Sequence, residues 1–181
     1  MCNSFNKKFL DEASKLVHLN EDLEVSNHTQ FMDQAIKIAI QGVVKNDGGP
    51  FGCIIVKDGK IIGSGNNKVT SSNDPTAHAE IIAIRDACQK LNSFQLDDCV
   101  IYTSCEPCPM CLGAIYWARP KKVYYGSNKS DAAKIGFDDD FIYKELDLDI
   151  TKRSISFEQL NRKNALEAFK AWEKKEDKTE Y

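Results

Sequence analysis

One pair of short motifs constrains this chain more than any other feature of its sequence. An H-x-E triplet occupies residues 78–80, and a P-C-x-x-C run occupies residues 107–111. Imidazole nitrogen and thiolate sulfur are preferred ligands of Zn2+, and three protein ligands leave the fourth tetrahedral position open for a water molecule. Water on zinc ionises near neutral pH and becomes a nucleophile. The motifs therefore predict a catalytic zinc site with His78, Cys108 and Cys111 as ligands and Glu80 as the residue that moves protons.

The two cysteines are expected to share one face of a helix. Cys108 and Cys111 are three residues apart, and side chains at this separation are neighbours on the surface of a helix. The prolines beside them suit a first helical turn. The positive end of the helix dipole favours thiolates at this position. A third thiol, Cys105, lies at the same spacing and leaves an alternative open, because a site with four protein ligands would be closed and structural. The long separation from His78 and the glutamate beside that histidine favour the catalytic site.

The histidine and the glutamate need a less regular backbone. On a regular helix, side chains two residues apart point roughly 200° away from each other. We therefore expect His78 to lie in a first turn that is not fully helical, so that its side chain and that of Glu80 converge. Asp74 and Pro75 fit the start of this helix, the first as its cap and the second as its first residue.

Length and charge limit the classes of protein to which the chain can belong. Its 181 residues fit one domain, and its net charge of -3 implies no general affinity for nucleic acid. The seven cysteines are an odd number and a zinc site needs reduced thiols, so we expect a cytoplasmic location. No apolar run is long enough for a signal peptide or a membrane span. Residues 1–26 form an N-terminal extension, for which a short amphipathic helix and a partly disordered segment are both open.

Hydrophobic periodicity predicts strands that alternate with helices. Residues 51–56 and 60–63 are expected to form a hairpin, because Asp58-Gly59 is a strong signal for a type I′ turn. This alternation indicates an α/β domain with a mixed sheet, in which both halves of the zinc site fall where a helix begins. Further strands are predicted at residues 100–104, 123–126 and 153–157, and helices at residues 29–42, 75–88, 112–117 and 160–174.

Several longer runs of sequence carry a family resemblance. They are N-D-P-T-A-H-A-E at residues 73–80, S-C-E-P-C-P-M-C at 104–111, G-G-P-F-G at 48–52, A-I-Y-W-A-R-P at 114–120, and G-F-D-D at 136–139 followed by F-I-Y-K-E at 141–145. With these runs, the chain from about residue 28 to its C-terminus resembles the cytidine deaminase-like zinc enzymes, and most closely the bacterial-type guanine deaminases. The first two runs are shared with transfer-RNA adenosine deaminases. The later runs, and a chain that ends in Tyr181, resemble the guanine branch.

The resemblance implies a three-layer α/β/α fold with a mixed five-stranded sheet, in a zinc-dependent deaminase domain that spans residues 27–181. It also implies a homodimer in which C-terminal segments are exchanged, so that a terminal tyrosine completes the partner's site. Substrate-binding roles carry over to five residues. They are Phe51, which would stack on a purine, Asn67, which would hydrogen-bond it, Asp139 and Tyr181, which would recognise or protonate it, and Ala79.

The residues alone leave other roles open for these positions. Phe51 is also compatible with a core aromatic, and Asn67 with a turn residue. Asp139 is part of an acidic run that is typical of a solvated surface. Tyr181 is at a chain end, where most proteins fray.

The function implied by the resemblance is hydrolytic deamination of guanine at C2, which gives xanthine and ammonia. Three alternatives remain: the same chemistry on guanosine, deamination of adenosine in tRNA, and a non-catalytic zinc module. A tRNA enzyme needs a cationic surface for phosphates, whereas residues 162–181 carry six Lys or Arg against five Asp or Glu. A non-catalytic module would have no task for Glu80. We therefore expect a small-molecule purine as substrate, and neither nucleic acid nor a membrane as a partner.

Overall fold

The computed structural model describes residues 27–181. The helix considered within residues 1–26 lies outside the described residues. The chain divides into two compact units, one that ends at Asp139 and a second that comprises Asp140–Tyr181. None of the described helices combines the length and the apolarity that a bilayer crossing requires.

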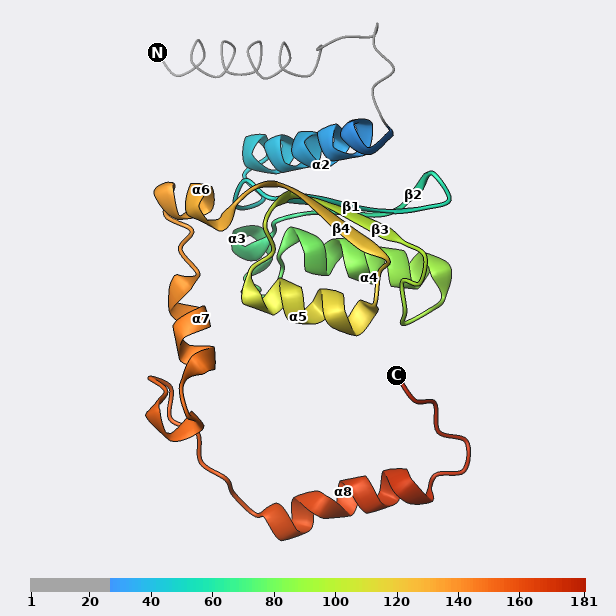
Figure 1. Cartoon of the computed structure of the whole chain (residues 1–181), viewed down its shortest axis with the longest axis vertical. Helices are drawn as coiled ribbons and strands as arrows, with labels where there is room; N and C mark the ends of the chain where they lie inside the picture. Colours follow the sequence, from blue (N-terminus) through green and yellow to red (C-terminus); the bar gives the residue numbers. More distant parts are fainter. Residues whose placement is uncertain (1–26) are drawn as a thin grey trace, which may run out of the picture. The chain divides into compact units, whose positions relative to one another are not determined.

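The first unit is built on a mixed sheet. Neighbouring strands follow the order β2-β1-β3-β4, in which β1 is antiparallel to both β2 and β3, and β4 is parallel to β3. The sheet passes through the middle of this unit in Figure 1. Its strands are β1 (Gly52–Lys57), β2 (Lys60–Asn66), β3 (Val100–Cys105) and β4 (Lys122–Ser127).

The hairpin between β1 and β2 confirms the predicted turn. Asp58 has a φ of 49° and Gly59 a φ of 72°. Positive φ at both central residues defines a type I′ turn, whose twist matches that of the flanking strands. The turn fixes the register Lys57 opposite Lys60, and a bulge follows between Ile55 and Val56.

Helices cover both faces of the sheet, which confirms the predicted three-layer α/β/α architecture. Helix α2 (Asn27–Val44) lies along one face, and α4 (Ala79–Leu91) and α5 (Pro109–Ala118) lie along the other (Figure 1). Alternate residues of the strands feed two separate cores. Ile54 and Tyr102 pack toward α2, whereas the core with α4 and α5 contains Cys53, Ile55 and Ile101 together with small helix residues.

Two glycines allow the helices to approach the sheet closely. A Cβ atom at Gly52 would collide with the backbone of α2, at Ala35 and Ala39. A Cβ atom at Gly65 would collide with the backbone of α4, at Ala79 and Ala83. The start of α4 is therefore held directly against β2.

The sheet has four strands among the described residues, rather than the five predicted. The missing strand is the one expected at residues 153–157, which are irregular in the structure. Their backbone forms a hydrogen bond with a nearby side chain instead of a neighbouring strand, because the amide of Ser154 donates to Glu145 Oε2 at 2.9 Å. The guanidinium of Arg153 also lies over the ring of Phe157, 5.6 Å from its centroid.

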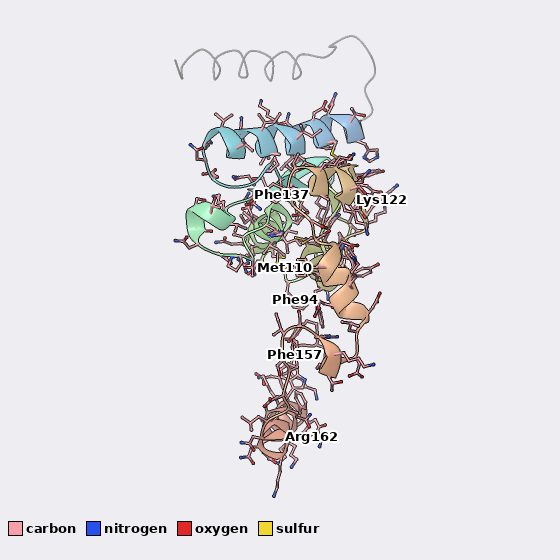
Figure 2. The ribbon with its side chains drawn as sticks, turned by 90° about the vertical axis from the view of Figure 1, so that its left-hand side faces the viewer. Phe94, Met110, Lys122, Phe137, Phe157 and Arg162 are labelled. Atoms are coloured by element: carbon pink, nitrogen blue, oxygen red, sulfur yellow. The ribbon has the colours of Figure 1, made fainter. Side chains whose placement is uncertain are left out.

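The second unit consists of short elements without buried residues in its helices. The helix predicted at residues 160–174 is present as α8, and Figure 2 labels Arg162 at its start. The unit leaves large apolar side chains exposed, among them Phe141, Leu160 and Phe169. Its elements are α7 (Asp140–Asp147), a 3-10 turn (Ile150–Lys152) and α8 (Arg162–Lys174).

Candidate active site

His78 lies immediately before a helix rather than inside its first turn. It is the N-cap residue of α4, with φ -72° and ψ 155°, so its backbone is extended. This extended residue lets the side chains of His78 and Glu80 point to the same side. The expectation that Asp74 and Pro75 begin the helix is wrong, because the Asp74 carboxylate instead accepts the amide and hydroxyl of Thr76 at 2.8 and 2.7 Å and forms a separate turn.

Cys108 occupies the equivalent position at the start of α5. It is the N-cap residue, with φ -65° and ψ 167°, and Pro109 is in the first turn as expected. Cys111 follows in that turn, and its side chain is fully buried. Both halves of the predicted zinc site are therefore helix starts, where unpaired backbone N–H groups favour negative charge.

The structure brings His78, Cys108 and Cys111 together into a group that can hold a metal ion. Their ligand atoms all lie within 4.8 Å of one another, and His78 Nδ1 is 3.5 Å from each Sγ atom. The thiol of Cys105 is used elsewhere, because it donates to the carbonyl of Asn128 at 3.7 Å. Among residues 27–181 this is the one such group, and it has three members. One imidazole and two thiols fit Zn2+ in an open, catalytic arrangement better than in a closed structural one.

The ionisation of the three groups also favours a cation. Interaction with the neighbouring Cys111 side chain lowers the pKa of Cys108 to about 4. The same interaction, together with burial, raises the pKa of Cys111. The Cys108 thiolate in turn raises the pKa of His78. The lowered pKa of Cys108 favours its thiolate, which is the form that binds metal.

Glu80 lies beside this group with its two oxygens in different surroundings. Its side chain is buried, and one oxygen, Oε1, accepts a hydrogen bond from Thr103 Oγ1 at 3.1 Å. The other oxygen, Oε2, is 3.5 Å from Cys111 Sγ and so faces the metal ligands. Burial raises the pKa of the Glu80 carboxyl, which favours the protonated form that a general acid needs.

A cavity of about 770 Å3 opens above these residues, and it is lined entirely by the first unit. Cys111 and Ala79 are fully buried and do not line it. Tyr181 belongs to the second unit and is exposed. The residues predicted from sequence that do line the cavity are Phe51, Asn67, His78, Glu80, Cys108 and Asp139.

Asn67 is held in one orientation by the backbone around it. Its side-chain oxygen accepts the amides of Gly49 and Val69, at 3.2 and 3.1 Å. Only oxygen can accept from two N–H groups, so the side-chain nitrogen is the atom left for the cavity. The neighbouring Asn66 has a structural task instead, because its amide donates to Asp47 at 2.9 Å.

Sequence reasoning missed several residues at this site. Phe137, labelled in Figure 2, lines the cavity and meets the ring of Phe51 edge-on, with centroids 4.9 Å apart. Glu106 and Lys129 line the cavity as well. Thr103 was assigned only to a strand, although a hydroxyl within the apolar run of residues 100–103 is a signal that the position has a polar partner.

Comparison with known proteins places the chain in a family. A family model described as the cytidine and deoxycytidylate deaminase zinc-binding region matches residues 25–127, which confirms zinc as the cofactor. The guanine deaminase of Bacillus subtilis is 57% identical over 155 residues, which are 86% of this chain and 99% of that protein. The tRNA-specific adenosine deaminase of Aquifex aeolicus is 46% identical over 78 residues, which are 43% of this chain and 52% of that protein.

A solved structure agrees with the sequence relationship. The X-ray structure of the Bacillus subtilis guanine deaminase has a TM-score of 0.83 to this chain, with 57% identity, and covers 85% of this chain and 98% of that one. The resemblance inferred from the motifs is therefore confirmed. The chain belongs to the cytidine and deoxycytidylate deaminase family of zinc proteins, in the group that contains the Bacillus subtilis guanine deaminase.

Proposed function

We propose that the protein is a zinc-dependent guanine deaminase, which hydrolyses guanine to xanthine and ammonia. The observation that carries this proposal is the 57% identity over 99% of the length of a guanine deaminase. The geometry of the site supports it independently, because a buried carboxylate lies beside a three-membered metal group at a cavity of small-molecule size.

His78, Cys108 and Cys111 would hold the ion. When bound, zinc would lower the pKa of a water ligand and so supply a nucleophile at neutral pH. Glu80 performs two proton transfers. Its Oε2 first takes one proton from water and gives it to the ring nitrogen next to C2. It then takes the remaining proton of the oxygen added at C2 and gives it to the amino group as the C–N bond breaks. The oxygen of water thereby replaces the amino group at C2, and the amine leaves as ammonia.

Three cavity residues recognise the purine in this proposal. The ring of Phe51, supported at its edge by Phe137, offers a face for stacking. Asn67 donates from its side-chain nitrogen to an acceptor of the base, since its oxygen is occupied. Burial raises the pKa of Asp139, which suits a carboxyl that exchanges a proton with the base.

Ala79 contributes its backbone rather than its side chain. The side chain is buried in the core, but the residue is the first of α4. Backbone N–H groups of a first helical turn have no acceptor within the helix and are available for a ligand. Its role as a substrate-binding residue therefore rests on its amide.

Guanosine is a second candidate substrate, because the cavity volume of about 770 Å3 leaves room for more than a purine base. Phosphorylated substrates fit less well. The cavity carries four carboxylates, on Glu80, Glu106, Asp138 and Asp139, against the ammonium of Lys129. Negatively charged side chains repel phosphate groups, so neither nucleotides nor tRNA are part of the proposal. Salt-sensitive binding of tRNA at micromolar concentration would contradict this exclusion.

The test of the proposed function is ammonia release by the zinc-loaded protein from guanine, guanosine, adenine and cytosine in parallel. Turnover of guanine with little turnover of guanosine is expected. Turnover of guanosine alone would mean that the substrate is the nucleoside rather than the base, and that the chemistry is the same. Stoichiometric zinc without ammonia release from any of the four would overturn the proposal and favour a non-catalytic zinc module.

We also propose a cytoplasmic homodimer in which Tyr181 completes the site of the partner subunit. Reduced thiols at the metal site support the location. The exposed apolar side chains of the second unit support an interface, since a small unit without a core of its own needs a surface to pack on. Mixing two inactive proteins, one with Glu80→Gln and one lacking residues 175–181, tests the exchange. Subunit exchange should restore activity, and no restoration would contradict a shared site.

A further inference from the structure

Buried polar side chains point to one residue that the proposed mechanism does not use. Three buried residues among those described are polar or charged: Asn67, Glu80 and Thr103. The first two line the cavity, but Thr103 does not. Its side chain is 1% exposed, so it cannot touch a substrate in the cavity.

Packing alone does not explain a hydroxyl at this position. Thr103 lies in β3 directly opposite Cys53 of β1, and Ile101 precedes it on the same face of the strand. Valine has nearly the shape of threonine and would fill this apolar space without a polar atom. The hydroxyl finds its partner in Glu80, whose Oε1 lies 3.1 Å from Thr103 Oγ1.

We propose that Thr103 is the positioning residue of Glu80. The carboxylate is planar and rotates over a broad range about its last bond, so one anchored oxygen fixes the direction of the other. The hydroxyl of Thr103 holds Oε1, and Oε2 then faces Cys111 and the metal ligands. Proton transfer requires this second oxygen within hydrogen-bond reach of the reacting groups. The inference deepens the proposed function and rests on its assignment of Glu80 as proton shuttle.

The test separates the hydroxyl from the shape of the side chain. In Thr103→Val the hydroxyl is lost at constant shape, and kcat should fall about tenfold to a hundredfold while KM stays within about twofold. In Thr103→Ser the hydroxyl is kept, and kcat should remain within about threefold of the parent. A valine variant with parental kcat would overturn the proposal, and so would a serine variant as slow as the valine variant.

A matched control comes from the neighbouring residue of the same strand. Tyr102 is as buried as Thr103 and its hydroxyl lies 2.5 Å from His28 Nδ1, on the opposite face of the sheet. Tyr102→Phe also removes one buried hydroxyl from β3, and its kcat should equal that of the parent. An equal loss of kcat in both variants would show a general effect of weakening β3 and would overturn the positioning role.

Two further measurements keep the test independent of folding and of substrate. If Thr103→Val does not fold, the pair Thr103→Ser and Thr103→Ala differs by the same hydroxyl. Crystal structures of the zinc-loaded variants report the carboxylate directly, and Glu80 should be rotated in the valine variant and unmoved in the serine variant, with zinc content equal in both. An unmoved carboxylate in the valine variant overturns the proposal even if guanine proves not to be the substrate. If guanine is not the substrate but Thr103 still positions Glu80, the Glu80 carboxylate will still be rotated in the valine variant.

Discussion

The two faces of the sheet use the same strand for different purposes. On the face covered by α2, the aromatic rings of Tyr102 and Tyr124 stack with centroids 5.2 Å apart, and Phe31 packs beside them. On the face covered by α4 and α5, the core consists largely of alanine, cysteine and isoleucine. Adjacent residues of β3 thus contribute a large ring to one layer and Thr103 to the other.

The difference shows how side-chain size places chemistry in this fold. Large rings fill much of the space between α2 and the sheet, and the backbone of α2 lies close to β1 at Gly52. Small residues, among them Ala79, Ala83 and Ala87, bring α4 against the sheet. The helix starts that carry His78 and Cys108 can converge only on that second face. One face therefore provides stability, and the other adds a site whose geometry depends on close approach.

Removal of the metal should give the largest difference in behaviour between the two faces of the sheet. Chelation should abolish turnover and, for free zinc at a thousand times Kd, remove about 4 kcal/mol from the free energy of unfolding. Hydrogen exchange should rise in the first turns of α4 and α5, where His78 and Cys108 lose their common ligand, and stay unchanged in α2. Equal loosening of α2 would contradict the independence of the two faces, and added zinc should reverse every change.

The next largest effect is expected for Glu80→Gln, which keeps the size of the side chain and removes its ability to shuttle a proton. We expect kcat to fall by about 100- to 10,000-fold, with zinc content unchanged because Glu80 is not a ligand in the proposed site. Glu167→Gln is the matched control, since Glu167 pairs with Lys170 on the surface of α8. Near-parental activity of Glu80→Gln would refute the proposed mechanism.

Substitution of Gly52 and Gly65, the glycines that lie against the backbone of α2 and α4, should have smaller effects that can be compared directly. Gly52→Ala and Gly65→Ala should each destabilise the fold by about 1–3 kcal/mol, because each added methyl group meets helix backbone. Gly65→Ala displaces the start of α4 and should also lower kcat and zinc content. Gly52→Ala displaces α2 and should leave kcat per folded molecule unchanged. Urea unfolding and zinc-normalised kinetics measure the two effects, and a loss of kcat in Gly52→Ala would contradict the comparison.

Residue chemistry alone predicts the metal group, because few combinations of imidazole and thiol at these spacings have another use. The type I′ hairpin and the layered architecture were also predicted, since turn chemistry and periodicity are local properties. The roles of Phe51, Asn67, Ala79, Asp139 and Tyr181 came from resemblance and stay predictions. The cavity lining supports a role for three of them, whereas Ala79 is buried and does not line the cavity and Tyr181 lies in the second unit.

What the sequence did not predict depends on contacts between distant segments. Thr103 and Glu80 are separated by 23 positions, and only the folded sheet brings them together. The start of α4 was placed too early because Asp74 has two uses, as a helix cap and as a turn residue, and the choice depends on the neighbouring Thr76. The strand predicted at residues 153–157 failed for a similar reason, since a Glu145 side chain occupies the amide that a strand would pair.

The smallest predicted effect concerns the hydrogen bond on the face that carries no chemistry. Tyr102→Phe should lower the free energy of unfolding by about 1 kcal/mol, as expected for one neutral hydrogen bond, because the hydroxyl of Tyr102 bonds to His28. A double-mutant cycle with His28→Ala should show that most of this loss disappears when His28 is already absent. Additive losses would mean that the two side chains do not interact. Because the stacked ring of residue 102 remains in the phenylalanine variant, the α2 face should keep its packing, and a stability change without any change in zinc content would distinguish this face from its opposite.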